Sequence, residues 1–382
     1  MSSYDIHSYA RMIRDGVRTS AYAEALRSCV GPNSVVLDMG TGVGIFALLA
    51  CQFGACRVYA VDPNNAIQVA RELAAANGYT DRIEFIADIS TRIILPEQAD
   101  VIVTEMHGVL PMFEQNLASI IDARQRLLVP GGTIIPQKET LWAAAVESPE
   151  YYEQVALPWS NGPYSLNMQP AMRIAANSWF KSNLGADALL AEPACWGILD
   201  YRNLESPGIA GKVNATATRA GTGHGIAVWF DTLLVEGIGF SNAPGAPETI
   251  FGQAFFPWPE AVAISPGDRI SLALRADLVG DYHLWKWETT ICDHAEKEKI
   301  SFRQSTFFDL PISSESIQKR ADDYLPRLSE DGELRRFVFS LMDGKTQLGK
   351  IADRAMAEFP ERFPGLGDAK AAVADLVEKY SD

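Results

Sequence analysis

Cysteine and histidine are scarce in this sequence, and their scarcity argues against several kinds of site. The 382 residues include five cysteines and five histidines. The cysteines are scattered, Cys51 and Cys56 have no second pair, and the histidines do not cluster. Zinc sites and disulfide frameworks both need regularly spaced ligands. We therefore expect no metal site, and reduced thiols in or near a core.

Long apolar runs are missing as well. No segment approaches the roughly 20 apolar residues that a membrane-spanning helix needs. The opening residues, MSSYDIHSYARMIRD, lack the apolar stretch of a secretion signal. We expect a cytoplasmic protein with no membrane partner.

Basic residues are outnumbered, with 33 lysines and arginines against 48 aspartates and glutamates and a formal charge of −15. This charge would repel phosphate backbones, so we expect no nucleic-acid partner. It would attract a cationic substrate, although acidity of this kind often only keeps a protein soluble.

Strand and helix patterns alternate over residues 31–137, after a helical pattern over residues 1–30. Short apolar runs such as VVLDM and RVYAVD are typical of buried parallel strands, and helical spacing follows them. The alternation predicts an α/β fold, a doubly wound Rossmann-like sheet whose ligand lies at the carboxyl ends of the strands. We expect residues 1–30 to cover that ligand.

The pattern changes after residue 137 to short, partly alternating runs separated by Gly, Pro and Asn. It predicts an antiparallel β-barrel or sandwich over residues 138–305, interrupted by a helical arm near residues 160–190. Residues 315–382 are helical in spacing and are expected to form a small separate unit.

A glycine-rich turn, GTGVG at residues 40–44, follows the first predicted strand and opens a helix. Glycines let the backbone approach a ligand closely, and helix N-terminal amides favour a negative group. Asp62 ends the next strand, where an acid accepts hydrogen bonds from ribose hydroxyls. The spacing favours S-adenosylmethionine over a nicotinamide or flavin, with a plain tight turn as the other interpretation.

Further along, Asp88 ends the following strand, either as a contact for the adenine amino group or as an ordinary loop aspartate. The cofactor-binding residues expected around the glycine turn are Asp38, Gly40, Gly42, Gly44, Asp62, Asp88 and Ile89.

Two glutamates, Glu105 and Glu114, stand nine residues apart in TEMHGVLPMFE, directly after a predicted strand. Side by side, they would grip a cationic nitrogen while it attacks a methyl group. Taken alone, they fit equally well as a solvated strand end and a helix N-terminal acid.

The residues around the glutamates resemble the double-glutamate loop of the protein arginine N-methyltransferases. That loop has glutamate, two residues, glycine, five residues and glutamate, followed by a helix with ARxxxL and then PGG. The matching residues here are Glu105, Gly108, Glu114, Ala123, Arg124, Leu127, Pro130, Gly131 and Gly132. The resemblance extends over roughly the first 300 residues, including LDMGTGVGIFALLACQFGA and MIRDGVRTSAY.

The resemblance implies an S-adenosylmethionine-dependent N-methyltransferase that acts on a guanidino group, most simply arginine in a protein or peptide. It implies a homodimer formed through the helical arm, which would begin at GPYSLNMQPAM. Glu105 and Glu114 would be the catalytic acids, and Glu105 would also contact the cofactor. Arg18 would pair with the carboxylate of the methyl donor.

Substrate contacts are implied for Met12, Asp15 and Thr249, but the chain departs from the family here. The family's Thr-His-Trp loop reads Thr249-Ile250-Phe251, so its histidine is missing and Asp15 needs another partner. The acceptor therefore stays open. Free arginine or another small amine in secondary metabolism would also fit, as would a non-catalytic, cofactor-binding peptide scaffold.

The last segment, with FVFSLMDGKTQLGKIADRAMAEFPERF, resembles small PqqD-like winged-helix domains. Such a domain would present a peptide substrate. A plain helical packing module is the alternative.

Overall fold

The computed structural model describes residues 5–160, 164, 166–309 and 313–381. The chain forms two compact units, Met1–Pro311 and Ile312–Asp382. Residues 1–4 of the expected N-terminal helical segment and Gly162, Pro163 and Ser165 of the expected arm lie outside the described residues.

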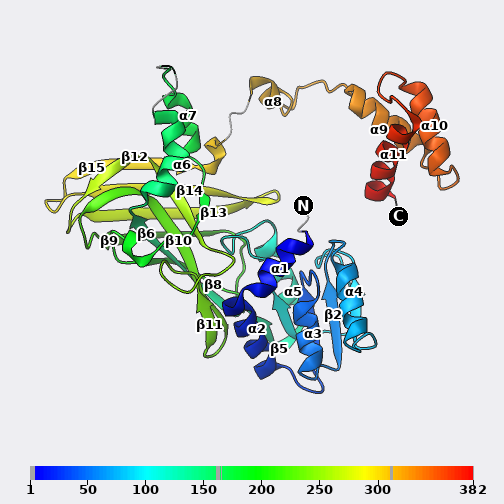
Figure 1. Cartoon of the computed structure of the whole chain (residues 1–382), viewed down its shortest axis with the longest axis horizontal. Coiled ribbons are helices and arrows are strands. Elements are labelled where there is room, and N and C mark those ends of the chain that lie inside the picture. The colour runs from blue at the N-terminus through cyan, green and yellow to red at the C-terminus, as the bar shows by residue number, and fades with distance from the viewer. Residues whose placement is uncertain (1–4, 161–163, 165, 310–312, 382) are drawn as a thin grey trace. The chain divides into compact units, whose positions relative to one another are not determined.

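The first unit begins with two helices, α1 (Ile6–Arg14) and α2 (Gly16–Cys29), which precede a parallel sheet (Figure 1). The five strands lie in the order β3-β2-β1-β4-β5, and every pairing is parallel. This order, with β1 at the centre, is the predicted doubly wound arrangement. The bounds are β1 (Val35–Met39), α3 (Ile45–Gln52), β2 (Arg57–Val61), α4 (Ile67–Ala76), β3 (Ile83–Ile86), β4 (Ala99–Thr104), α5 (Asn116–Arg126) and β5 (Leu128–Ile135).

Two antiparallel sheets follow, as the alternating pattern predicted. One has the order β7-β12-β10-β6-β8 with β11 paired to β10, and the other has the order β15-β14-β13-β9. Their bounds are β6 (Lys138–Val146), β7 (Phe180–Ser182), β8 (Ala194–Asp200), β9 (Ile209–Thr216), β10 (Gly221–Val235), β11 (Ile238–Ser241), β12 (Gln253–Ile264), β13 (Arg269–Val279), β14 (Tyr282–Cys292) and β15 (Glu298–Ser305).

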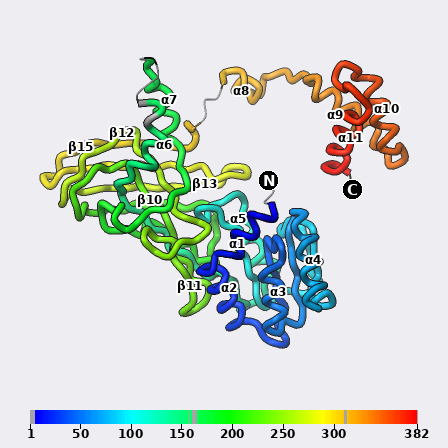
Figure 2. Tube along the Cα trace, in the orientation of Figure 1, coloured from blue at the N-terminus to red at the C-terminus, as the bar shows by residue number. Residues whose placement is uncertain are grey.

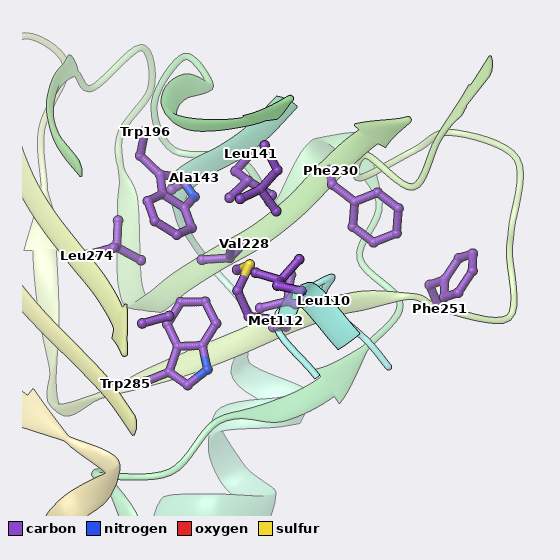
Figure 3. Packing of buried hydrophobic residues seen from close by; sticks show 14 of the residues in the cluster. Leu110, Met112, Leu141, Ala143, Trp196, Val228, Phe230, Phe251, Leu274 and Trp285 are labelled. Carbon is purple, nitrogen blue, oxygen red and sulfur yellow. The ribbon is translucent and has the colours of Figure 1, made fainter. Parts of the chain in front are cut away.

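Buried apolar residues from both antiparallel sheets form one core. Trp196 of β8 and Trp285 of β14 meet with ring centroids 6.0 Å apart. Val228 of β10 and Leu274 of β13 belong to the same buried cluster (Figure 3). The inward side of each sheet is therefore buried against the other, and we refer to residues 138–305 as the barrel.

Two helices, α6 (Pro149–Ser160) and α7 (Gln169–Ala175), contact each other where the chain leaves the barrel, as the green trace of Figure 2 shows. At the other end, α2 packs against β10, β11 and β5, so the N-terminal helices lie where the parallel sheet and the barrel meet.

The second unit contains four helices and no strand among its described residues. They are α8 (Ser314–Gln318), α9 (Glu330–Leu341), α10 (Leu348–Glu358) and α11 (Leu366–Tyr380). Leu334, Val338, Ile351 and Val373 lie in a buried cluster that draws its members from this unit alone. Across the described parts of the whole chain, no helix combines the length and the apolar character needed to cross a bilayer.

Candidate active site

The glycine turn adopts a backbone conformation that side chains disfavour. Gly40, Gly42 and Gly44 have φ values of 72°, 52° and 84°. A Cβ on Gly42 would lie 2.5 Å from Cε1 of Tyr9, and a Cβ on Gly44 would lie 2.8 Å from Cβ of Ala70. The turn therefore needs glycine for both conformation and space, and α1, which carries Tyr9, lies directly against it.

Asp38 is hydrogen-bonded to this turn and to the helix that follows it. Its Oδ2 accepts hydrogen bonds from Oγ1 of Thr41 at 2.6 Å and from the amide of Ala47 at 2.9 Å. Burial raises its pKa to about 7, against the lowering effect of these two donors. Its bonds thus go to the turn and to the start of α3, while its Oδ1 is buried without a partner among the described residues.

Asp62 lies at the end of β2, as predicted, and bonds to the same turn. Its Oδ2 accepts the amide of Gly42 and its Oδ1 the amide of Asn64, both at 2.8 Å. Burial raises the pKa of this carboxyl. Asp88 and Ile89 follow β3, both half-buried, and the Asp88 carboxylate accepts the Ile89 amide at 2.7 Å.

These residues fit a nucleoside cofactor. The glycines leave no Cβ over the turn, and helix α3 begins directly after it. Asp62 follows β2 and Asp88 follows β3, so acids lie at the carboxyl ends of these strands. A Cβ on Gly40 would lie 2.6 Å from Cγ of Met106, so the turn also touches the loop that carries Glu105.

Arg18 and Glu105 form a buried ion pair between Nη1 and Oε2. Arg18 also donates from Nη2 to the carbonyl oxygen of Met12 at 2.8 Å, and its Nε is buried without a partner among the described residues. Burial raises the pKa of Glu105, while Arg18 and the amide of His107 lower it. The structure thus brings Met12, Arg18 and Glu105 together.

Glu114 differs from Glu105 in its surroundings. It lies just before α5, with a φ of 42° and a half-buried side chain. Within the described ranges it has no hydrogen bond or ion pair. No interaction joins it directly to Glu105, but both belong to residues 105–114, which we call the acid loop.

Apolar contacts hold the middle of the acid loop in place. Leu110 and Met112 are buried in the core that also contains Val228 and Trp285, and Figure 3 shows them among these barrel side chains. Directly after the loop, Gln115 donates to the carbonyl oxygen of Gly280 at 2.7 Å. The barrel therefore supports the loop on which both acids stand.

Asp15 lacks the histidine partner that the resemblance implies and is hydrogen-bonded to a main-chain amide instead. Its Oδ1 accepts the amide of Arg18 at 3.0 Å, and its Oδ2 accepts the amide of Ile250 at 2.7 Å. Thr249 is buried, and its Oγ1 is unpaired among the described residues. A main-chain amide thus takes the place of a side chain at this contact.

Sequence reasoning missed two buried groups beside the acid loop. Nε2 of His107 lies 3.0 Å from Oε1 of Glu139, and neither side chain is more than 2% exposed. The signal for Glu139 was present, because in KETLWAAAV it alternates with Leu141 and so shares the inward face of a strand. His107 carries no comparable local signal.

Two family models match the chain. "Ribosomal protein L11 methyltransferase (PrmA)" matches residues 18–151, and "Arginine methyltransferase oligomerization subdomain" matches residues 137–284. Both matches end before the second unit.

Curated relatives carry related names. "Probable protein arginine N-methyltransferase 6" of Arabidopsis thaliana is 31% identical over 286 residues, which are 71% of this chain and 64% of that protein. "Protein arginine N-methyltransferase 1" of Dictyostelium discoideum is 28% identical over 278 residues, 71% of this chain and 81% of that protein. The chain thus spans just under two thirds of the first relative.

Solved structures of similar proteins share the fold. The PRMT1 enzyme-prozyme heterotetrameric complex of Trypanosoma brucei with AdoHcy gives a TM-score of 0.72 at 20% identity, over 80% of this chain and 98% of that one. Arabidopsis thaliana protein arginine methyltransferase 10 gives 0.69 at 23% identity, over 79% and 97%. Sequence, architecture and the acid loop agree, and all three make the chain similar to the protein arginine N-methyltransferases.

Proposed function

We propose that this protein transfers a methyl group from S-adenosylmethionine to a guanidino nitrogen of arginine in a protein or peptide. The similarity to protein arginine N-methyltransferases favours this reaction over methylation of free arginine or another small amine. It equally favours an active enzyme over a cofactor-binding scaffold.

The cofactor supplies an electrophilic methyl group on a positively charged sulfur. Asp62 would accept hydrogen bonds from the ribose, and Gly40, Gly42 and Gly44 would let the backbone approach the donor. Arg18, whose Nε is unpaired among the described residues, would bind the donor carboxylate. We place Asp38, Asp88 and Ile89 in the same site.

The acids would bind and orient the acceptor. A guanidinium approaching a second cation in a dry pocket meets a repulsion of several kcal/mol. Two carboxylates, Glu105 and Glu114, would offset that repulsion and aim one nitrogen at the methyl group. Met12 would pack beside this nitrogen, and Asp15 and Thr249 would shape the pocket. The nitrogen becomes more acidic as it bonds to carbon, so a strong general base is not required.

One observation carries the proposal: one of the two acids is in an ion pair and the other is not. Glu105 is tied to Arg18, whereas Glu114 is half-buried and unpaired within the described ranges. An unpaired carboxylate on the same supported loop as a buried ion pair is suited to bind a cationic ligand.

The test uses the full-length protein, labelled S-adenosylmethionine and three acceptors: an arginine-rich peptide, free arginine and a simple amine. We expect label on the peptide. Glu114→Gln should lower transfer by about 100- to 1,000-fold, the cost of losing one charge-stabilising group. S-adenosylmethionine binding, measured by calorimetry, should not change. Glu236→Gln, in the exposed turn after β10, is the matched control.

Each other result has a distinct meaning. Label on free arginine or the amine alone would replace the peptide with a small molecule as acceptor. Cofactor binding without transfer to any acceptor would favour the scaffold.

We also propose that the protein is a cytoplasmic homodimer whose α6 and α7 form the contact arm. The match to an oligomerization subdomain supports this, and Leu166, which is 59% exposed beside α7, offers an apolar contact. Sedimentation should give twice the mass of one chain. Leu166→Asp should shift the protein toward monomer, and an unchanged dimer would place the interface elsewhere.

For the second unit we propose a role in presenting a peptide substrate. Its helices border an open pocket of about 610 Å³, whose apolar lining residues are Phe339, Met342, Leu348, Ile351, Val377 and Tyr380. A chain that ends before Ser313 should lose transfer to peptides but keep S-adenosylmethionine binding. If the shortened chain still transferred methyl groups to peptides, the second unit would be a plain helical packing module.

A further inference from the structure

A buried polar network lies behind the acid loop, and the proposed reaction does not yet use it. Glu139 of β6 is fully buried. Its Oε2 accepts the hydroxyl of Tyr201 at 2.7 Å, and its Oε1 accepts Oγ1 of Thr232 at 3.3 Å and lies 3.0 Å from Nε2 of His107. The four residues come from β6, β10, the segment after β8 and the acid loop, and we call them the His107 network.

The network is attached to Glu105 through the main chain. The main-chain amide of His107 lies where it lowers the pKa of the Glu105 carboxylate, while the His107 side chain bonds to Glu139. One residue thus links the first acid to the barrel. The imidazole is also enclosed by Phe230 and Phe251, with ring centroids 5.6 and 5.7 Å away. Phe251 belongs to the segment that lacks the family's histidine.

The pair is a hydrogen bond between neutral groups at neutral pH. Burial raises the pKa of Glu139 to about 8, and burial together with Arg18 lowers the pKa of His107 to about 3. The titratable groups that act on the pair are Arg18 and Tyr22 of α2, Glu105 and Tyr201. A neutral pair can stay buried without the cost of an isolated charge.

We propose that His107 and Glu139 are positioning residues for methyl transfer. Their hydrogen bond ties the acid loop to the barrel and holds the His107 amide where it orients Glu105 toward the acceptor. The inference rests on the proposed function, because Glu105 is assigned there to the acceptor. His107 and Glu139 act through Glu105 and do not contact the reacting atoms.

The test compares substitutions that break the hydrogen bond with one that keeps it. Glu139→Leu and His107→Leu break it, whereas Glu139→Gln keeps the length of the side chain and can still bond to both His107 and Tyr201. We expect kcat for an arginine-rich peptide to fall by about 10- to 100-fold in the leucine variants, as a displaced catalytic group does. Glu139→Gln should retain most of kcat, and S-adenosylmethionine binding should hold in all three.

Hydrogen exchange gives a readout that needs no turnover. Peptides covering residues 105–114 should exchange faster in Glu139→Leu than in the wild type and Glu139→Gln. Val146→Ala opens a cavity in a different buried cluster of the barrel, one that contains no residue of the acid loop or of the His107 network, and so controls for general destabilisation. It should lower the thermal midpoint yet leave kcat and exchange in the acid loop unchanged.

The outcomes separate the two proposals. A wild-type protein that transfers no methyl group would refute the proposed function. Hydrogen exchange would then still show whether the hydrogen bond between His107 and Glu139 holds the acid loop in place. An active wild type with wild-type kcat in Glu139→Leu would overturn the positioning role. So would a loss of kcat in Val146→Ala as large as in Glu139→Leu, because stability alone would then explain both.

Discussion

Asp15 joins two segments that are 235 residues apart in the chain. Its carboxylate caps α2 through the amide of Arg18 and also binds the amide of Ile250. The resemblance placed Asp15 beside this segment and left its partner open. Every residue except proline has a main-chain amide. The sequence therefore cannot show which amide will donate to Asp15.

We therefore expect Asp15→Ala to destabilise the first unit. Losing a helix cap costs about 1 kcal/mol, and losing a second buried bond to a charged acceptor costs about 1 to 3 kcal/mol more. Urea denaturation should report this as a lower free energy of unfolding. Asp5→Ala removes the exposed cap of α1, which accepts the Ser8 amide at 2.8 Å, and should cost far less. Equal losses would contradict the double role.

Glu139 should also make stability depend on pH. Its pKa is raised from 4.5 to about 8 in the folded chain, so the folded state keeps a proton that the unfolded state has released. This contribution is complete below the unfolded pKa and is lost as pH rises through the folded pKa. The free energy of unfolding of wild type minus that of Glu139→Gln should fall as pH rises from about 5 to 8, by at most about 1.4 kcal/mol per pH unit.

His107 acts in the opposite sense. Its pKa is lowered from 6.5 to about 3, so its contribution is present above the unfolded pKa and is lost as pH falls toward the folded value. Denaturation curves at several pH values would separate the two effects. A difference between wild type and Glu139→Gln that does not change with pH would show that Glu139 is not protonated in the folded chain.

Among the elements, the glycine turn is the one whose geometry the sequence predicted best. Three glycines at alternate positions between a strand and a helix admit few conformations, and all three have positive φ. The strands and helices around the turn follow the predicted pattern, since burial on both faces of a parallel sheet requires continuous apolar runs such as VVLDM.

Gly42→Ala should damage this element. The change places a Cβ 2.5 Å from the Tyr9 ring in a conformation that costs a side chain about 1 to 2 kcal/mol. We expect weaker S-adenosylmethionine binding by calorimetry and a lower thermal midpoint. Gly16→Ala, where a Cβ meets nothing within 4 Å, is the control and should leave binding unchanged. Equal binding by both variants would argue that the turn does not approach the cofactor.

At the level of the whole molecule, the chain consists of two units, each with its own core, and the second unit begins with an exposed segment. Every residue from 313 to 330 is exposed, including Lys319, Arg320 and Arg327. The alternation of strands and helices, the change to antiparallel strands and the final helical spacing indicated these parts in order.

Limited trypsin digestion should therefore cut first at Lys319, Arg320 or Arg327. Mass spectrometry should find two fragments that resist further digestion, because each retains its own buried core. Replacing all three residues with glutamine should make the full chain resistant under the same conditions. Early cleavage before residue 310 or after residue 330 would contradict this division.

By itself the sequence determined the order of elements, the glycine turn, the acid at the end of β2 and the two glutamates after β4. Those features depend on periodicity and local backbone preference, which act over a few residues. The tertiary structure alone decided which groups meet across the junction of the sheet and the barrel. Asp15 bonds to Ile250, Arg18 to Glu105 and His107 to Glu139, because folding brings distant segments together and an unpaired buried polar group costs free energy.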